Sequence, residues 1–156
     1  MNIRKRIDKA LEVALCLILS LLVIDVVWQV LSRYVLKSPS SFTDELACFL
    51  LIWTGLLGAA YVAGKQEHLA IDIWLQKCEG RNKTILQMVI YCCTLVFATT
   101  VLVIGGSSLV YSRFLLSVTS ASLQINLGYV YMVLPLSGVL ISYYTIDNAI
   151  NYLKSN

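Results

Sequence analysis

Four long apolar runs constrain most strongly how this chain can fold. They cover about residues 10–36, 43–64, 84–106 and 125–150, and an α-helix needs roughly 20 apolar residues to cross a bilayer. Of the 156 residues, 58% are hydrophobic and only 13% are charged, against about 25% charged in an average soluble domain. A soluble domain of this size could not bury so much apolar surface. The sequence therefore predicts a single all-α membrane domain, residues 1–156, with four transmembrane helices.

Two of the runs contain features that disturb a straight helix. The third apolar stretch continues from Thr84 to about Leu116, which as one helix is about 50 Å long against roughly 30 Å of hydrocarbon. It must tilt, break at Gly105-Gly106 or project out of the membrane. The fourth run contains Pro135, for which we expect a kink or local break.

A shorter element is expected between the second and third runs. Residues 69–80 are too few and too polar to span. On a helix drawn through them, apolar side chains lie together opposite a polar face that includes His68 and Asp72. This pattern predicts an amphipathic helix in the membrane interface, and a cytoplasmic loop with one helical turn is the alternative.

The distribution of basic residues predicts the orientation of the chain. Lysines and arginines concentrate on the cytoplasmic side of membrane proteins. With four spans, nine fall on the side of the termini: Arg4, Lys5, Arg6, Lys9, Lys65, Lys77, Arg81, Lys83 and Lys154. The other side has only Arg33, Lys37 and Arg113. Both termini are therefore expected in the cytoplasm, and no basic tract suited to nucleic acid is present.

A polar stripe crosses the first span. Asp25, Gln29 and Arg33 follow one another at four-residue steps, so they lie on one side of the helix. Ionisable groups are costly inside a bilayer, and the stripe should face protein rather than lipid. It predicts either an ion or proton site or a set of hydrogen bonds to neighbouring helices or a partner subunit.

The second span contains small residues at helical spacing. Gly55, Ala59 and Ala63 recur every four residues, a pattern that lets two helix backbones approach closely. It indicates a helix-packing seam, which either this chain or a partner could complete.

Acidic residues and one histidine flank the second span. Asp44 and Glu45 lie in its first turn, where the positive end of the helix dipole favours carboxylates. They are interpreted as helix-capping residues or as a docking site at the outer membrane face. His68 and Asp72 have the spacing of metal ligands, but one histidine with acids is weak evidence for zinc. We interpret them as an inward anchor, and we expect no cofactor and no catalytic site.

Together, these segments resemble the small membrane subunit of tripartite ATP-independent periplasmic (TRAP) transporters. Residues 42–60 resemble that family's acidic pair, apolar run, tryptophan and Leu-Gly-Ala-Ala sequence. The family pattern is also matched by residues 67–72, by Arg33 and by residues 131–138. The chain departs from it in having only Lys65 as a basic residue before His68, and in lacking a proline before the last span.

The resemblance implies a partner protein that performs the transport. In the family, a larger multi-span permease subunit holds the substrate and sodium sites, and a periplasmic substrate-binding protein delivers an organic acid. The small subunit then serves as a scaffold in the bacterial inner membrane, among lipids. The resemblance makes Asp44 and Glu45 candidates for a docking site on the outward face. It makes His68 and Asp72 candidates for an anchor on the inward side.

Two other classes of protein remain as alternatives at this point. A small proton-coupled multidrug exporter also has four spans and a carboxylate in the first, for which Asp25 or Glu12 could serve. A membrane thiol or quinone oxidoreductase needs an outward-facing cysteine pair. A bis-histidine haem anchor needs two axial histidines, and the chain has one.

Overall fold

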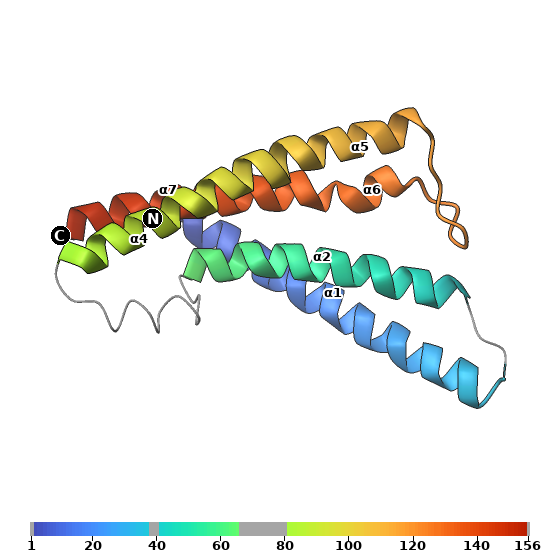
Figure 1. The fold of residues 1–156 in the computed structure, drawn as a ribbon. Coiled ribbons are helices and arrows are strands. Elements are labelled where there is room, and N and C mark those ends of the chain that lie inside the picture. The colour runs from blue at the N-terminus through green and yellow to red at the C-terminus, as the bar shows by residue number, and fades with distance from the viewer. Residues whose placement is uncertain (1, 38–40, 66–80, 156) are drawn as a thin grey trace. The chain divides into compact units, whose positions relative to one another are not determined.

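The computed structural model describes residues 2–37, 41–65 and 81–155 (Figure 1). In these ranges the backbone forms α-helices and one π-helical segment. In chain order the helical elements are α1 (Asn2–Tyr34), α2 (Ser41–Lys65), α4 (Arg81–Phe97), η1 (Ala98–Gly105), α5 (Gly106–Leu115), α6 (Leu127–Tyr131) and α7 (Val133–Ser155).

Four stretches of helix are long and apolar enough to cross a membrane. They are Arg4–Tyr34, Ser41–Lys65, Lys83–Leu115 and Leu127–Lys154. The prediction of an all-α membrane protein with four transmembrane helices is therefore confirmed. The expected interfacial helix over residues 69–80 lies outside the described residues.

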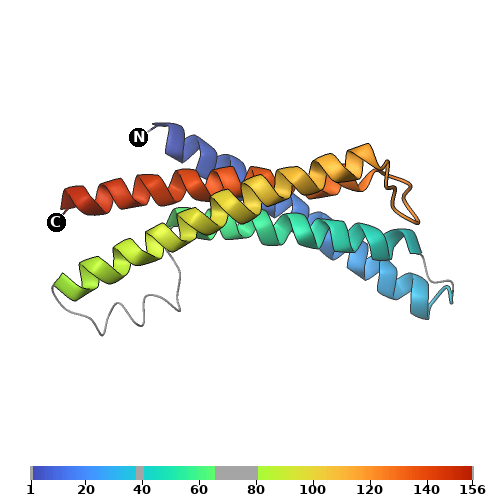
Figure 2. The ribbon, with the colours of Figure 1, turned by 45° about the horizontal axis from the view of Figure 1, so that its top comes forward.

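The third span continues through Gly105-Gly106 without a break (Figure 2). Gly106 has helical dihedral angles, φ −61° and ψ −43°, and its N–H donates to the carbonyls of Val101 and Val103. Helix continuity is retained by widening residues 98–105 into a π-helix. The sequence left three alternatives for this long run: a tilt, a break at Gly105-Gly106, or projection out of the membrane. The predicted break is wrong.

Two threonine hydroxyls donate to backbone carbonyls where the π-helical segment begins. The Thr99 hydroxyl donates to the Leu95 carbonyl at 2.8 Å, and the Thr100 hydroxyl donates to the Val96 carbonyl at 2.6 Å. Such bonds compete with the backbone donors for the same carbonyls and loosen the helical turn.

The fourth span is interrupted one turn before Pro135, as expected. Helix α6 ends at Tyr131 and α7 begins at Val133. Proline has no N–H to donate to the carbonyl four residues earlier, and its ring collides with that carbonyl. For Pro135 this carbonyl belongs to Tyr131, which is where α6 stops.

The chain forms two compact units. One comprises residues 1–58 and 108–133, and the other comprises residues 59–107 and 134–156. In the second unit, η1 and α7 approach so closely that a Cβ on Gly138 would lie 2.7 Å from the Leu102 Cβ. Glycine is therefore required at this helix crossing.

Candidate functional site

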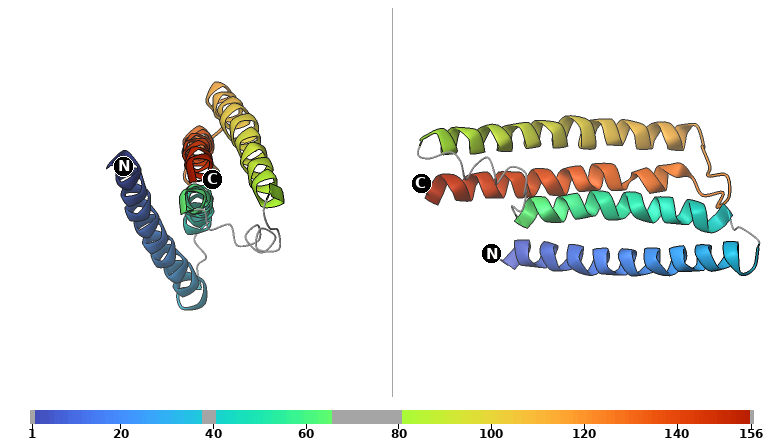
Figure 3. Two further views of the ribbon diagram at one scale, coloured as in Figure 1. Left: turned by 90° about the vertical axis from the view of Figure 1, so that its left-hand side faces the viewer. Right: turned by 60° about the horizontal axis from the view of Figure 1, so that its bottom comes forward.

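In the first unit, Glu45 binds the connection between α5 and α6. Its carboxylate accepts hydrogen bonds from the Ser120 hydroxyl at 2.8 Å and from the N–H groups of Ala121, Ser122 and Leu123 at 2.9–3.0 Å. The connection thus lies beside the first turn of α2 (Figure 3). The four donors meet one charged acceptor, and hydrogen bonds to ionised groups are stronger than neutral ones.

The connection has its own backbone structure, which presents these donors together. Thr119 and Asn126 form an antiparallel bridge, and the residues two positions before each of them, Ser117 (φ 47°) and Gln124 (φ 52°), have left-handed backbone conformations. The Asn126 side chain then caps α6 by accepting a hydrogen bond from the Gly128 N–H at 2.8 Å. We call residues 117–126 the hairpin.

Further contacts hold α6 next to the hairpin. The Trp53 indole N–H donates to the Val130 carbonyl at 3.1 Å. The rings of Phe114 and Tyr129 pack edge to face with centroids 5.1 Å apart, a favourable arrangement for aromatic rings. A Cβ on Gly128 would lie 2.6 Å from the Phe114 ring, so a larger residue here would displace this ring.

The second acidic residue, Asp44, binds the polar stripe of α1. The Gln29 side-chain amide donates to an Asp44 carboxylate oxygen, and the Arg33 guanidinium lies 3.7 Å from the same oxygen. The two charged side chains are 56% and 51% exposed. Two of the three stripe residues therefore contact one of the two first-turn carboxylates.

Asp25 is the third member of the stripe and differs from the other two. Only 7% of its surface is exposed, and its Oδ2 atom has no hydrogen-bond partner among the described residues. Over the same ranges, no group of three or more histidine, cysteine, aspartate or glutamate side chains could hold a metal ion. One buried carboxylate does not form a cation site by itself.

The predicted seam of α2 is divided between two environments. Gly55 and Ala59 are exposed, and no described atom lies within 4 Å of a Cβ built on Gly55. Ala63 is only 7% exposed. The spacing at four-residue steps thus does not correspond to one continuous contact within the described chain.

In the second unit, α2 packs tightly against α7. A Cβ on Gly64 would lie 2.9 Å from the ring of Tyr144, which is fully buried. The Asn148 side chain donates to the Ala63 carbonyl at 3.0 Å. A small residue and a polar hydrogen bond therefore define this helix contact, as is common between transmembrane helices.

Sequence reasoning missed several residues of these contacts. It identified Glu45 without its partners in residues 120–123, and it did not identify Tyr144 or Asn148 at all. The turn-rich composition of the hairpin and the presence of the polar Asn148 in an apolar helix were the available signals. His68 and Asp72 lie outside the described residues, so their anchoring role stays a prediction.

Comparison with known proteins decides the family. Residues 22–155 match the family described as tripartite ATP-independent periplasmic transporters, DctQ component. This match covers most of the chain. The chain belongs to this family.

Three relatives agree with the family assignment. A putative TRAP transporter small permease protein of Haemophilus influenzae is 33% identical over 95 residues, 58% of this chain and 59% of the relative. The sialic acid TRAP transporter permease protein SiaT of the same species is 34% identical over 73 residues, 44% of this chain and 12% of SiaT. The small permease protein SiaQ of Vibrio cholerae is 24% identical over 152 residues, 97% of this chain and 86% of SiaQ.

The family also decides between the classes considered from sequence. It is a family of transporter components, not of enzymes. The alternatives of a multidrug exporter and of an oxidoreductase or haem anchor are therefore not retained. The family and the four apolar helices together indicate a multi-pass protein of the inner membrane.

Proposed function

We propose that this chain is the scaffold subunit of a sodium-coupled transporter that takes up an organic acid. In this proposal a larger multi-span permease performs the transport, and a periplasmic binding protein supplies the substrate. The family membership of residues 22–155 is the observation that carries the proposal. The similarity to SiaT, whose length far exceeds the matched region, supports a large permease as the partner.

The described polar groups of the first unit support a scaffold role rather than a substrate site. Asp44 and Glu45 bind Gln29, Arg33 and the hairpin. A substrate carboxylate would be repelled by both acids and would have to compete for their donors. These side chains thus shape an outward surface, on which we place the contact with the binding protein.

The open face of α2 supports a second contact, with the large permease. Gly55 and Ala59 are exposed in an apolar helix and would allow a second helix backbone to approach closely. We place the permease on this face. His68 and Asp72 remain the proposed anchor on the inward side.

The proposed orientation has both termini in the cytoplasm, on the basis of the nine basic residues against three. Reporter fusions at residue 156 and within the hairpin test it. We expect a cytoplasmic reporter to be active only at the C-terminus and a periplasmic reporter only in the hairpin. The reverse pattern would contradict the orientation.

Uptake by cells tests the function itself. A host without its own carriers would express the permease and binding protein from the same genome, with or without this chain. Uptake of labelled sialic acid and of a dicarboxylate would be measured in sodium and in potassium medium. We expect sodium-dependent uptake of one acid only when the chain is present, and unchanged uptake without it would overturn the proposal.

A further inference from the structure

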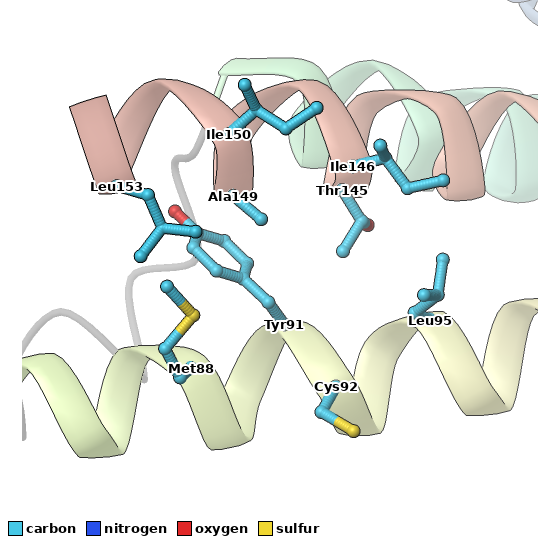
Figure 4. Close-up of a pocket in the computed structure, with 9 residues that line it drawn as sticks. All are labelled: Met88, Tyr91, Cys92, Leu95, Thr145, Ile146, Ala149, Ile150 and Leu153. Carbon is cyan, nitrogen blue, oxygen red and sulfur yellow. The ribbon is translucent and has the colours of Figure 1, made fainter.

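The second unit contains a groove between α4 and α7 whose nine lining residues are uncharged (Figure 4). Such a surface accepts a lipid tail as readily as an apolar side chain of another protein, so it does not select one kind of partner. A charged side chain without a counter-ion is more selective, because it favours a group of opposite charge. The first unit contains such a side chain at Arg113.

Arg113 lies in the last turn of α5, at the end of the third span. Its guanidinium lies over the ring of Tyr131, 5.9 Å from the ring centroid, within the range of a cation–π contact. Its Nε atom is buried and has no hydrogen-bond partner among the described residues. No ion pair joins the guanidinium to a described carboxylate. An aromatic ring therefore positions this charge, but nothing in the described chain neutralises it.

The five acids of the first unit do not supply the missing counter-ion. Asp44 binds the polar stripe of α1, and Glu45 binds the hairpin. Asp25 is buried, and no ion pair joins it to the guanidinium. Asp8 and Glu12 lie near the start of α1, which a four-span topology puts on the opposite side of the membrane from the end of the third span. Because an unneutralised charge is costly in a span, we expect the counter-ion to come from another molecule.

The direction of the side chain favours a carboxylate over a lipid phosphate. Leu115 and Leu116 follow Arg113 and are 69% and 68% exposed, so apolar surface continues past it toward the end of the span. Helical side chains lean toward the N-terminal end of their helix, which here is the direction away from that end. The guanidinium accordingly contacts Tyr131, which lies four residues inside the fourth span. The nearer lipid headgroups lie in the other direction.

We propose that Arg113 binds an aspartate or glutamate of the large permease subunit beside the ring of Tyr131. This inference rests on the proposed function, which supplies the permease as a membrane-spanning partner. The carboxylate would accept hydrogen bonds from the guanidinium N–H groups, an arrangement that arginine favours at interfaces. The proposed contact at Gly55 and Ala59 is one of close backbone packing and supplies no charge. Arg113 would make the association depend on charge as well as on shape.

The affinity of the chain for the permease tests the role of this charge. In detergent, Arg113→Gln should raise the Kd about thirtyfold, because the permease carboxylate would be left desolvated without its partner. Arg33→Gln is the matched control and should change the Kd less than about twofold, since Arg33 is exposed and pairs with Asp44 within the chain. Circular dichroism identifies the folded variants.

The same titration separates this inference from the proposed function. Equal Kd values for folded Arg113→Gln and Arg33→Gln chains would overturn the inference and leave the proposed function intact. Failure of the unaltered chain to bind the permease would contradict the proposed function, and the inference with it.

Carbodiimide cross-linking identifies the group that faces Arg113. Dicyclohexylcarbodiimide enters apolar regions and couples a lysine amine to a nearby carboxylate. In the complex of Arg113→Lys, mass spectrometry of the digested protein should find position 113 joined to an aspartate or glutamate of the permease. In Arg33→Lys, position 33 should be joined to Asp44 of the same chain. Coupling at position 33 but not at position 113 would contradict the proposed contact.

Removal of lipid distinguishes the permease carboxylate from a phosphate. The difference in Kd between the unaltered chain and Arg113→Gln should persist after both proteins are delipidated. It should also remain the same when phosphatidylglycerol is added back. A difference that is present only with phosphatidylglycerol would assign Arg113 to a lipid phosphate and overturn the proposal.

Discussion

Helix α2 uses its small residues in two different ways along its length. At Gly64, in the second unit, the backbone lies against the buried ring of Tyr144. At Gly55, in the first unit, no described atom lies near the position of a Cβ. The same residue type thus serves packing within the chain at one position and leaves a surface open at the other.

The largest loss of stability is expected from adding a side chain at Gly64, where the helix backbone lies against the Tyr144 ring. Gly64→Leu places a side chain where the Tyr144 ring already lies, and overpacking of this kind destabilises a fold by about 1–3 kcal/mol or more. Thermal unfolding of the detergent-solubilised chain, followed by circular dichroism, measures the loss. Tyr144→Ala in the same chain should restore part of it. Gly58→Leu is the control, because its site is open, and equal losses at both positions would remove the distinction.

At Gly55 an added side chain should leave the stability of the chain nearly unchanged and should weaken its binding to the permease. Gly55→Leu or Ala59→Leu should change the stability of the chain itself by no more than about 0.5 kcal/mol, as is usual for surface positions. Both should instead reduce the yield of complex that co-purifies with the large permease, because the added side chain blocks close helix approach. Val13→Leu, on the exposed surface of α1, provides the comparison. An unchanged yield would place the partner on another face.

A moderate, local effect is expected at the N-terminal end of α2. Glu45→Ala removes the acceptor shared by Ser120 and the N–H groups of residues 121–123. Amide hydrogen exchange of residues 121–123 should become several-fold faster, with little change elsewhere. Glu45→Gln should lie between, since an amide has one acceptor oxygen. Ser122→Ala is the control and should have no effect, because Ser122 binds Glu45 through its backbone N–H. Unaltered exchange in Glu45→Ala would show that the hairpin keeps its conformation without Glu45.

The smallest effect is expected at Asp44. Asp44→Asn retains an oxygen for Gln29 and removes only the charge opposite Arg33. Because both charged groups are about half exposed, the pair should contribute less than about 1 kcal/mol. A double-mutant cycle with Arg33→Gln, measured by thermal unfolding, gives this coupling. A much larger value would mean that the polar stripe of α1, and not the hairpin, holds the first turn of α2.

Much of the fold could be predicted from local features of the sequence. The apolar runs predicted the spans, and Pro135 predicted the interruption of the last one, because both effects depend on residues within a few positions of one another. Of the stripe of Asp25, Gln29 and Arg33, the last two contact Asp44 and the first is buried. The family pattern, which extends over most of the chain, also agreed with the later comparison.

The contacts that define the sites depend on residues distant in the sequence. Glu45 and Ser120 are 75 positions apart, and Ala63 and Asn148 are 85 apart. Helical spacing placed Gly55 and Ala63 on one seam, but which neighbour approaches each of them follows from tertiary packing. The π-helical segment was also missed; it contains two adjacent threonines whose hydroxyls share carbonyls with the backbone.

Reconstituted transport tests the central claim, that this chain holds a transporting partner and does not transport by itself. Proteoliposomes would contain the chain alone, the large permease alone, or both, with the binding protein, its loaded substrate and a sodium gradient outside. We expect substrate accumulation only with both subunits, and none with the chain alone even under a pH gradient. Substrate movement through the chain alone, or full activity of the permease without it, would contradict the account.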